Sequence, residues 1–234
     1  MKKKIAVIPA RGGSRRIPRK NIVDFCGKPM IAWTIEAAVK SGCFDRIIVS
    51  TDSPEISKIA GQWGCEVPFL RQTAADDHSP VSLATIAAVH QAAAFFKEEY
   101  GVVAQMMPNC PLRQESDVRA AVKNFLEKQA PFQISCFKYG FMNPWWAFKL
   151  EDGGKGRFLF EEALQKRSQD LEGLYCPAGS IWLARWDSLV SANTFYGPGQ
   201  IFFPLSWIAG VDIDTVEDLE MAQAVARTAY KNKV

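Results

Sequence analysis

Five basic side chains follow the first apolar run of the chain, and together they could neutralise a phosphate group. The run at residues 5–8 ends at Pro9, and Gly12 and Gly13 come soon after it. A buried strand that breaks into a glycine-containing loop lets the backbone approach an anion closely. The positively charged residues of this loop are Arg11, Arg15, Arg16, Arg19 and Lys20. The pattern predicts a phosphate-binding loop at the carboxyl end of a strand, where open α/β sheets bind ligands.

The loop matches neither of the two commonest phosphate-binding motifs. It contains no Gly-x-Gly-x-x-Gly and no Gly-x-x-x-x-Gly-Lys followed by Ser or Thr, so the sequence lacks the dinucleotide and P-loop signatures. Most basic runs are solvated surface or nucleic-acid patches. The paired glycines and the preceding apolar strand favour a phosphate site instead. The formal net charge of +3 implies no general affinity for nucleic acid.

Two aspartates near the end of the chain could hold a divalent cation. Asp212 and Asp214 flank Ile213, and strand spacing would place both carboxylates on one side, with Val211 and Ile213 in the core. Mg²⁺ accepts few protein ligands and completes its octahedron with phosphate oxygens and water. Alternatively, Asp214 could favour the positive end of the following helix. One role does not exclude the other.

Alternating strand and helix patterns should position these residues. We predict strands at 5–8, 46–49 and 102–106 and helices at 29–41, 54–64, 80–96, 116–128 and 215–230, the last opened by a capping box of Thr215 and Asp218. Strands that alternate with helices indicate parallel crossovers in a doubly wound, mainly parallel α/β sheet. The length of 234 residues fits a single domain, 1–234.

The segment 132–203 has a different character. Short aromatic pieces at 134–137, 146–149 and 181–184 are separated by glycine and proline and are typical of strands. They could extend the main sheet or form a small β-rich excursion. Aromatic residues of this kind suit a subunit interface, although core packing explains them nearly as well.

The cysteine pattern and the residues that follow Met1 favour a cytoplasmic protein. The six cysteines form no Cys-x-x-Cys pair, and only two histidines accompany them, so reduced thiols are expected rather than a disulfide framework or a soft-metal site. The apolar stretch at 5–10, which follows three lysines, is shorter than a signal-peptide core, and no other segment has the length of a membrane span. We expect neither a membrane nor a nucleic-acid partner.

The basic loop and several later blocks resemble the acylneuraminate cytidylyltransferases. These are the CMP-sialic acid synthetases and their bacterial relatives for pseudaminic and legionaminic acids. The similar blocks follow the family order and span nearly the whole chain; they lie at 8–21, 25–31, 49–52, 67–71, 105 with 111–113, 167–171 and 211–214.

The resemblance implies a Rossmann-like nucleotidyltransferase. Such an enzyme transfers CMP from CTP to the anomeric hydroxyl of a nine-carbon 2-keto acid sugar and releases pyrophosphate, with Mg²⁺ as cofactor and no covalent nucleophile. Its partners would be CTP, the acidic sugar and a second copy of the chain. In the family, the stretch that corresponds to 132–203 projects outward and exchanges contacts with the second subunit.

The resemblance also assigns residues. The catalytic group comprises Arg11, Lys20, Asp212 and Asp214, of which the two aspartates hold the metal ion. The nucleotide-binding group comprises Arg11, Gly12, Gly13, Ser14, Arg15, Lys20, Asn21, Arg71 and Ser82. The sugar-binding group comprises Gln105, Arg167 and Gln169. Arg15 stands where the family usually has lysine, and Asn109 and Cys110 replace its usual hydroxyl pair. Asp77 and Ser82 share one block, which could equally cap the long helix.

Two alternatives remain open. A 3-deoxy-manno-octulosonate cytidylyltransferase would share the arginine loop and the block at 27–29, but it typically has Lys-Pro-Leu where this chain has Lys20, Asn21 and Ile22. A catalytically silent nucleotide-binding protein would not need to retain both the basic loop and the aspartates. Among the nine-carbon sugars, the sequence favours no single one.

Overall fold

The computed structural model describes residues 2–71 and 80–229. The candidate residue Asp77 and the last residue of the predicted helix at 215–230 lie outside the described residues. Across the described parts of the chain, no helix is both long enough and apolar enough to cross a membrane.

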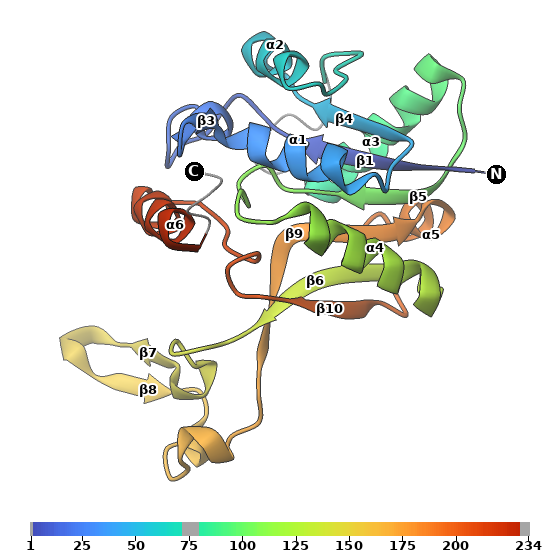
Figure 1. Ribbon diagram of the computed structural model, residues 1–234. Helices are drawn as coiled ribbons and strands as arrows, with labels where there is room; N and C mark the ends of the chain where they lie inside the picture. Colours follow the sequence, from blue (N-terminus) through green and yellow to red (C-terminus); the bar gives the residue numbers. More distant parts are fainter. Residues whose placement is uncertain (1, 72–79, 230–234) are drawn as a thin grey trace.

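A six-stranded sheet forms the centre of the molecule (Figure 1). Its strand order is β10-β6-β9-β5-β1-β4, and β9 is antiparallel to both of its neighbours while the other pairs are parallel. The mainly parallel α/β architecture predicted from the sequence is therefore confirmed. The strands are β1 (Lys3–Pro9), β4 (Arg46–Ser50), β5 (Tyr100–Gln105), β6 (Phe132–Lys138), β9 (Tyr175–Arg185) and β10 (Ile201–Leu205).

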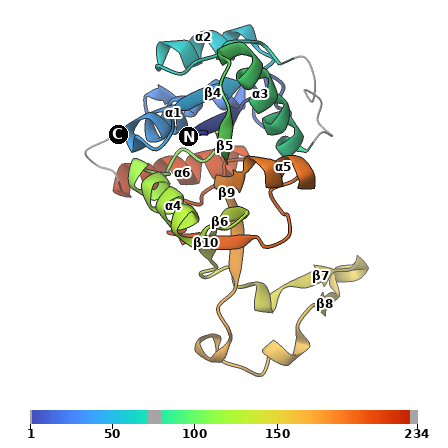
Figure 2. The same ribbon diagram turned by 90° about the vertical axis from the view of Figure 1, so that its right-hand side faces the viewer.

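Helices cover both faces of this sheet, as Figures 1 and 2 show from two directions. On β1, Ala6 and Ile8 pack into one apolar cluster, whereas Ile5 and Val7 pack into another. The alternation is the period of two that a strand buried on both faces requires. The first cluster includes α1 (Met30–Ser41), α2 (Pro54–Gln62) and α4 (Glu115–Lys128); the second includes α3 (Val81–Phe96) and α5 (Trp186–Ala192).

A third apolar cluster joins the last helix, α6 (Val216–Ala229), to the segment that carries the two aspartates. Asp218 accepts a hydrogen bond from the Thr215 backbone (2.8 Å), and Thr215 Oγ1 accepts one from the Asp218 backbone (3.2 Å). The predicted capping box is thus confirmed. The chain between β1 and α1 adds a 3-10 turn, η1 (Lys20–Ile22), and two short paired strands, β2 (Asp24–Phe25) and β3 (Lys28–Pro29).

The prediction of a strand around the two aspartates is wrong. Strand β10 ends at Leu205, and the described residues 206–215 form no strand before α6 begins. Val211 and Ile213 are nevertheless buried, as the alternation predicted. The segment therefore has the side-chain pattern of a strand without a neighbouring strand to hold it.

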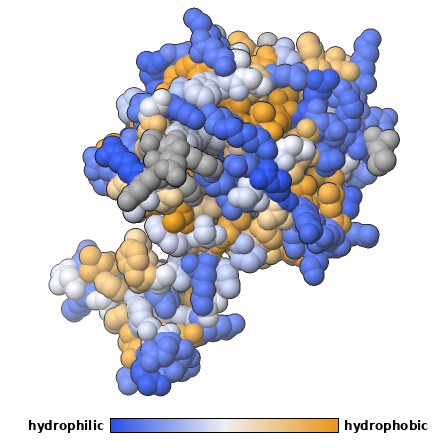
Figure 3. All heavy atoms as spheres, viewed as in Figure 1, coloured by the Kyte–Doolittle hydropathy of each residue, from blue (hydrophilic) through white to orange (hydrophobic). Residues whose placement is uncertain are grey.

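Residues 139–174, between β6 and β9, project away from the sheet as a separate lobe (Figures 1 to 3). We call them the projecting segment. Strands β6, β9 and β10 belong to the main sheet, so only the middle of the range 132–203 projects. The segment contains β7 (Phe148–Leu150) paired with β8 (Gly156–Phe158), and the 3-10 turns η2 (Pro144–Trp146), η3 (Asp152–Gly154), η4 (Glu161–Ala163) and η5 (Ser168–Asp170).

Candidate active site

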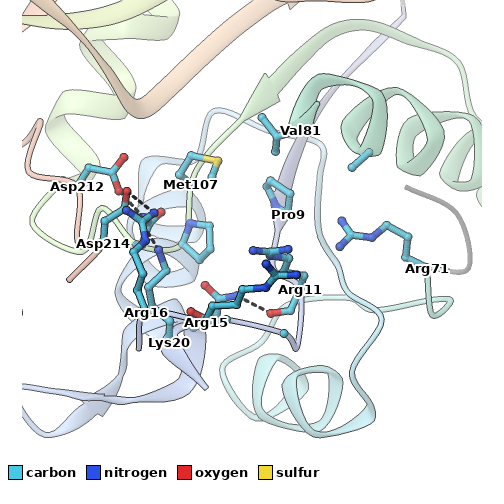
Figure 4. A pocket seen from close by; sticks show the side chains of 16 residues that line it. Pro9, Arg11, Arg15, Arg16, Lys20, Arg71, Val81, Met107, Asp212 and Asp214 are labelled. Atoms are coloured by element: carbon cyan, nitrogen blue, oxygen red, sulfur yellow. Dashed lines mark hydrogen bonds and ion pairs between the residues drawn. The ribbon is translucent and has the colours of Figure 1, made fainter. Parts of the chain in front are cut away.

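A cavity of about 540 Å³ opens where β1 and β5 end, the position at which open α/β sheets bind ligands. It brings together residues from both ends of the chain, from Pro9 to Asp214 (Figure 4). The lining residues are Pro9, Arg11, Gly13, Ser14, Arg15, Arg16, Lys20, Asn21, Arg71, Val81, Ala84, Met107, Pro108, Asn109, Asp212 and Asp214.

The basic loop after β1 is held from two sides. The Gly12 backbone donates to Asp52 Oδ1 (2.8 Å), and Asn21 Nδ2 donates to the carbonyl oxygen of Arg11 (2.8 Å). A Cβ atom added at Gly12 would lie 3.0 Å from Cβ of Ser53, so the close approach of these two loops favours glycine there. The predicted phosphate loop is thus a fixed part of the cavity wall.

One side of the cavity carries Arg11 and Arg71, as Figure 4 shows. Arg71 is only 7% exposed, and its Nε has no hydrogen-bond partner among the described residues. Burial lowers the pKa of its guanidinium group; the charge of Asp52 opposes this effect, and the charge of Arg11 adds to it. Two neighbouring cations, one of them desolvated, would be stabilised by an anion between them.

The opposite side carries the two aspartates. Asp214 is bound by two cations: Lys20 Nζ lies 2.7 Å from its Oδ1, and an Arg16 guanidinium nitrogen lies 2.8 Å from its Oδ2. Although burial opposes ionisation, the hydrogen bond and charge of Lys20, together with Arg16, hold the pKa of Asp214 below its usual value. Asp214 is therefore a permanent anion at neutral pH.

Asp212 has different surroundings. Although much of the residue is open to the cavity, nearby protein atoms desolvate its carboxyl group, and this effect together with the charge of Asp214 raises its pKa to about 6. Asn109 Nδ2 donates a hydrogen bond to Asp212 Oδ1. A Cβ atom added at Gly179 would lie 3.5 Å from Asp212 Oδ2 and 2.9 Å from Cγ of Met107, so β9 passes close behind this carboxylate.

The donor set fits a hard divalent cation. Two carboxylates face one cavity, and the described residues contain no group of three or more metal-ligating side chains. A cation at Asp212 and Asp214 would therefore take two protein ligands and draw the rest from phosphate and water, which is how Mg²⁺ is usually held. Its charge would also offset the desolvation that raises the pKa of Asp212.

Three predicted residues lie near the cavity but do not line it. Gly12 holds the loop in place through its backbone hydrogen bond to Asp52. Ser82 is buried in the first turn of α3, between the lining residues Val81 and Ala84. Gln105 is 1% exposed; its Oε1 accepts a hydrogen bond from Thr85 Oγ1 (2.7 Å), and its Nε2 has no partner among the described residues.

The structure does not bring Arg167 and Gln169 to the cavity. Both are exposed residues at or within η5 of the projecting segment. Arg167 Nε instead lies 2.8 Å from Asp170 Oδ2. Within one chain, these two residues belong to the lobe that points away from the sheet (Figure 1).

Seven lining residues were not assigned to the site from the sequence: Pro9, Arg16, Val81, Ala84, Met107, Pro108 and Asn109. Arg16 was visible as part of the basic loop, but its pairing with Asp214 depends on the fold. The sequence singles out Asn109 only because the resembled family usually has a hydroxyl residue there. No sequence motif indicates Met107.

The model of the family described as cytidylyltransferase matches residues 5–169, which include the basic loop, Arg71 and Asn109. The chain belongs to the cytidylyltransferase family. It is therefore a nucleotidyltransferase, and the resemblance inferred from the sequence blocks is confirmed.

Several cytidylyltransferases align with nearly the whole chain. A pseudaminic acid cytidylyltransferase of Campylobacter jejuni is 33% identical over 236 residues, covering 98% of this chain and 99% of the relative. A CMP-N,N'-diacetyllegionaminic acid synthase of Legionella pneumophila is 33% identical over 231 residues, with 94% of each chain covered. A solved CMP:2-keto-3-deoxy-manno-octonic acid synthetase complexed with CTP has a TM-score of 0.72 at 19% identity, covering 97% of this chain and 99% of that one, and this likeness shows the fold.

Proposed function

We propose that this cytidylyltransferase transfers CMP from CTP to the anomeric hydroxyl of a nine-carbon 2-keto acid sugar of the sialic, legionaminic or pseudaminic type. The observation that carries the proposal is a single cavity with Arg11 and Arg71 on one side and Asp212 and Asp214 on the other. The relatives named for pseudaminic and legionaminic acids, at 33% identity over nearly the full chain, support this substrate class.

In the proposed reaction, the sugar hydroxyl oxygen attacks the α-phosphorus of CTP. The bond from that phosphorus to the bridging oxygen breaks, pyrophosphate leaves, and the hydroxyl proton passes to solvent. Arg11, Arg15 and Lys20 line the cavity and would follow the charge that moves onto pyrophosphate. Gly13, Ser14 and Asn21 would contact the nucleotide beside them.

We assign the metal ion to Asp212 and Asp214. When bound, Mg²⁺ would polarise the phosphoryl group and lower the pKa of the attacking hydroxyl. Asp214 is already ionised because Lys20 and Arg16 pair with it. Asp212, with a pKa of about 6, is largely ionised at neutral pH, so both carboxylates carry charge under working conditions.

The sugar site would be completed by a second copy of the chain. Arg167 and Gln169 lie on the projecting segment, outside the cavity of their own chain. The segment exposes several large apolar side chains, which are typical of an interface; they include Phe141, Met142, Phe148, Leu150 and Leu159. A homodimer that buries these side chains could also carry Arg167 to the partner's cavity, where its guanidinium group would bind the sugar carboxylate.

The test is pyrophosphate release with CTP, UTP, ATP or GTP and a panel of acid sugars. The panel consists of pseudaminic, legionaminic and N-acetylneuraminic acids, with 3-deoxy-manno-octulosonate as the eight-carbon comparison. We expect strong preference for CTP and for one nine-carbon sugar. Comparable turnover with UTP or ATP would contradict the nucleotide assignment. Preference for the eight-carbon sugar would contradict the sugar class, and no release with any pair would favour a silent nucleotide-binding protein.

A further inference from the structure

Asn109 makes an unusual two-way connection to the segment that carries the aspartates. The Ile213 backbone N–H donates to the carbonyl oxygen of Asn109 (2.9 Å), and Asn109 Nδ2 donates to the carbonyl oxygen of Ile213 (3.0 Å). One residue thus satisfies both backbone polar groups of Ile213, as a neighbouring strand would in a sheet. Residues 206–215 have no such strand, and the side-chain amide of Asn109 takes its place.

The same side chain also holds Asp212. Asn109 Nδ2 donates to Asp212 Oδ1 as well as to Ile213. Both partners are acceptors, so they determine which end of the amide faces them. Lys20 Nζ donates to the Ile213 carbonyl too (3.0 Å) while it pairs with Asp214. Asn109 therefore fixes Asp212 directly and Asp214 through Ile213.

This arrangement leaves one polar atom without a partner. Asn109 is 4% exposed, and its Oδ1 has no hydrogen-bond partner among the described residues. A buried acceptor without a partner destabilises the folded state. The amide is thus oriented so that its nitrogen donates to two acceptors, and its oxygen is left without a donor. Buried polar atoms that lack a hydrogen-bond partner in a native structure often belong to functional sites.

The loop that carries Asn109 is itself firmly anchored. Arg113, which is fully buried, donates to Thr34 Oγ1 (2.6 Å), to the carbonyl oxygen of Met107 (3.3 Å) and to that of Ser180. Thr34 Oγ1 also donates to the Met107 carbonyl (3.3 Å). These bonds join α1, the loop after β5 and strand β9. Asn109 is therefore presented to the aspartates from a rigid support.

We propose that Asn109 is a positioning residue that holds the segment 211–214 so that the carboxylates of Asp212 and Asp214 can act on one cation. The proposal rests on the proposed function, because the cation in question is the one that the reaction would use. Groups that orient metal ligands typically contribute 10–100-fold to metal affinity or activity.

The test compares wild type with two variants. Asn109→Leu keeps the branched arrangement of side-chain heavy atoms but removes the donor, and Asn109→Ala cannot clash if the larger leucine folds poorly. Asn124→Ala is the matched control, because Asn124 Nδ2 also donates to a side-chain oxygen, Gln133 Oε1 (2.7 Å), but lies on α4 away from the cavity. The readouts are amide hydrogen exchange of the peptide covering 211–215, the dissociation constant for Mn²⁺, and the dissociation constant for CTP without metal.

For both Asn109 variants we expect roughly tenfold faster exchange at 211–215 and a Mn²⁺ dissociation constant raised roughly tenfold or more. CTP affinity without metal should stay close to that of wild type, because Arg11 and Arg71 lie on the other side of the cavity. Asn124→Ala should leave all three values unchanged. Unchanged Mn²⁺ affinity in the Asn109 variants would overturn the proposal, and so would a loss of Mn²⁺ and CTP binding together, which indicates general destabilisation.

These outcomes are separable from the failure of the proposed function. Amide exchange requires no substrate, and Mn²⁺ binding requires no sugar. If the wild-type protein releases no pyrophosphate with any acid sugar, the proposed function fails on that assay. The Mn²⁺ comparison would still decide whether Asn109 positions the two carboxylates.

Discussion

At the scale of single residues, Asp212 and Asp214 are two carboxylates of one cavity with opposite electrostatic surroundings. Lys20 and Arg16 hold the pKa of Asp214 low in spite of its burial, whereas desolvation and the neighbouring Asp214 raise the pKa of Asp212 to about 6. The two carboxylates therefore differ in how readily they ionise before any ligand binds. The two cations that pair with Asp214 hold its carboxylate in place. The surroundings of Asp212 disfavour its ionised form, and a divalent cation could stabilise that form.

We therefore predict that Asp212→Asn and Asp214→Asn each abolish most turnover. Both replacements are isosteric, so Asp212→Asn should keep its melting temperature, while Asp214→Asn should lose some stability because Lys20 and Arg16 lose their anion. Pyrophosphate release across a Mg²⁺ titration and thermal unfolding of each variant provide the measurement. Near-normal activity in both variants would contradict the metal assignment, and global unfolding would make the carboxylates structural.

At the scale of elements, the edge of the sheet formed by β1, β4 and β5 depends on Glu98, which lies between α3 and β5. The carboxylate accepts hydrogen bonds from Arg46 (2.8 and 3.0 Å), from Lys3 (2.5 Å) and from Tyr100 (2.9 Å). Its bonds with Arg46 and then Lys3 lower its pKa to about 2. Arg46 also pairs with Glu66 (2.8 Å), so this network joins strands that are far apart in the chain.

Glu98→Gln should destabilise the protein in a pH-dependent way. Because the folded state favours the ionised carboxylate, the stabilisation is fully present above the ordinary glutamate pKa of about 4.3 and is lost as the pH falls toward 2. The difference in unfolding free energy between wild type and Glu98→Gln should accordingly be largest at pH 6–7 and shrink at pH 3. Urea unfolding at several pH values measures it. A difference that does not change with pH would contradict the assignment to the ionised form.

The projecting segment is the element on which the sugar assignment depends. If Arg167 binds the sugar carboxylate, Arg167→Ala should lower kcat/KM for the sugar roughly tenfold or more, from loss of a charge-assisted interaction of about 1.5–3 kcal/mol. CTP binding should be nearly unchanged. Arg157→Ala is the matched control, since Arg157 lies in the same segment and pairs with Glu151 (3.0 Å) in a similar way. An equal loss of CTP affinity would place Arg167 at the phosphates.

At the scale of the whole molecule, several large apolar side chains of the projecting segment are exposed on the lobe. Phe141 is 88% exposed and Leu150 is 74% exposed. Soluble monomers seldom expose such side chains in groups, and groups of this kind mark association surfaces. The lobe stands away from the main body (Figure 3), so a second chain is the surface that we expect to cover it.

The protein should accordingly sediment as a dimer at micromolar concentration. The double substitution Phe141→Ser with Leu150→Ser should produce monomers that still bind CTP but turn over the sugar poorly, because each cavity would lose the partner's projecting segment. Phe95→Ser is the control; Phe95 is 60% exposed on α3, outside the lobe. Sedimentation velocity and pyrophosphate release are the measurements. A wild-type monomer with full activity would contradict the dimer and the shared sugar site together.

The sequence by itself determined the architecture and the basic half of the cavity. Apolar runs of strand length, helix caps and glycines are local signals, so the main helices and the strands β1, β4 and β5 were predictable to within a few residues. The basic loop was predictable for the same reason, because its glycines, its cations and the strand before it are consecutive.

Only the tertiary structure decided how the aspartates are held and which loop residues accompany them. The alternation of Val211 to Asp214 correctly predicted which side chains are buried but wrongly predicted a strand, because strand character depends on a partner that the local pattern does not contain. No strand pairs with this segment among the described residues, and the side chain of Asn109, about a hundred residues earlier, takes the place of one. The pairing of Arg16 with Asp214, the burial of Gln105 and the distance of Arg167 from its own cavity likewise depend on contacts between distant segments. A periodic pattern shows which side of a segment is apolar, but the position of each segment depends on packing of the whole chain.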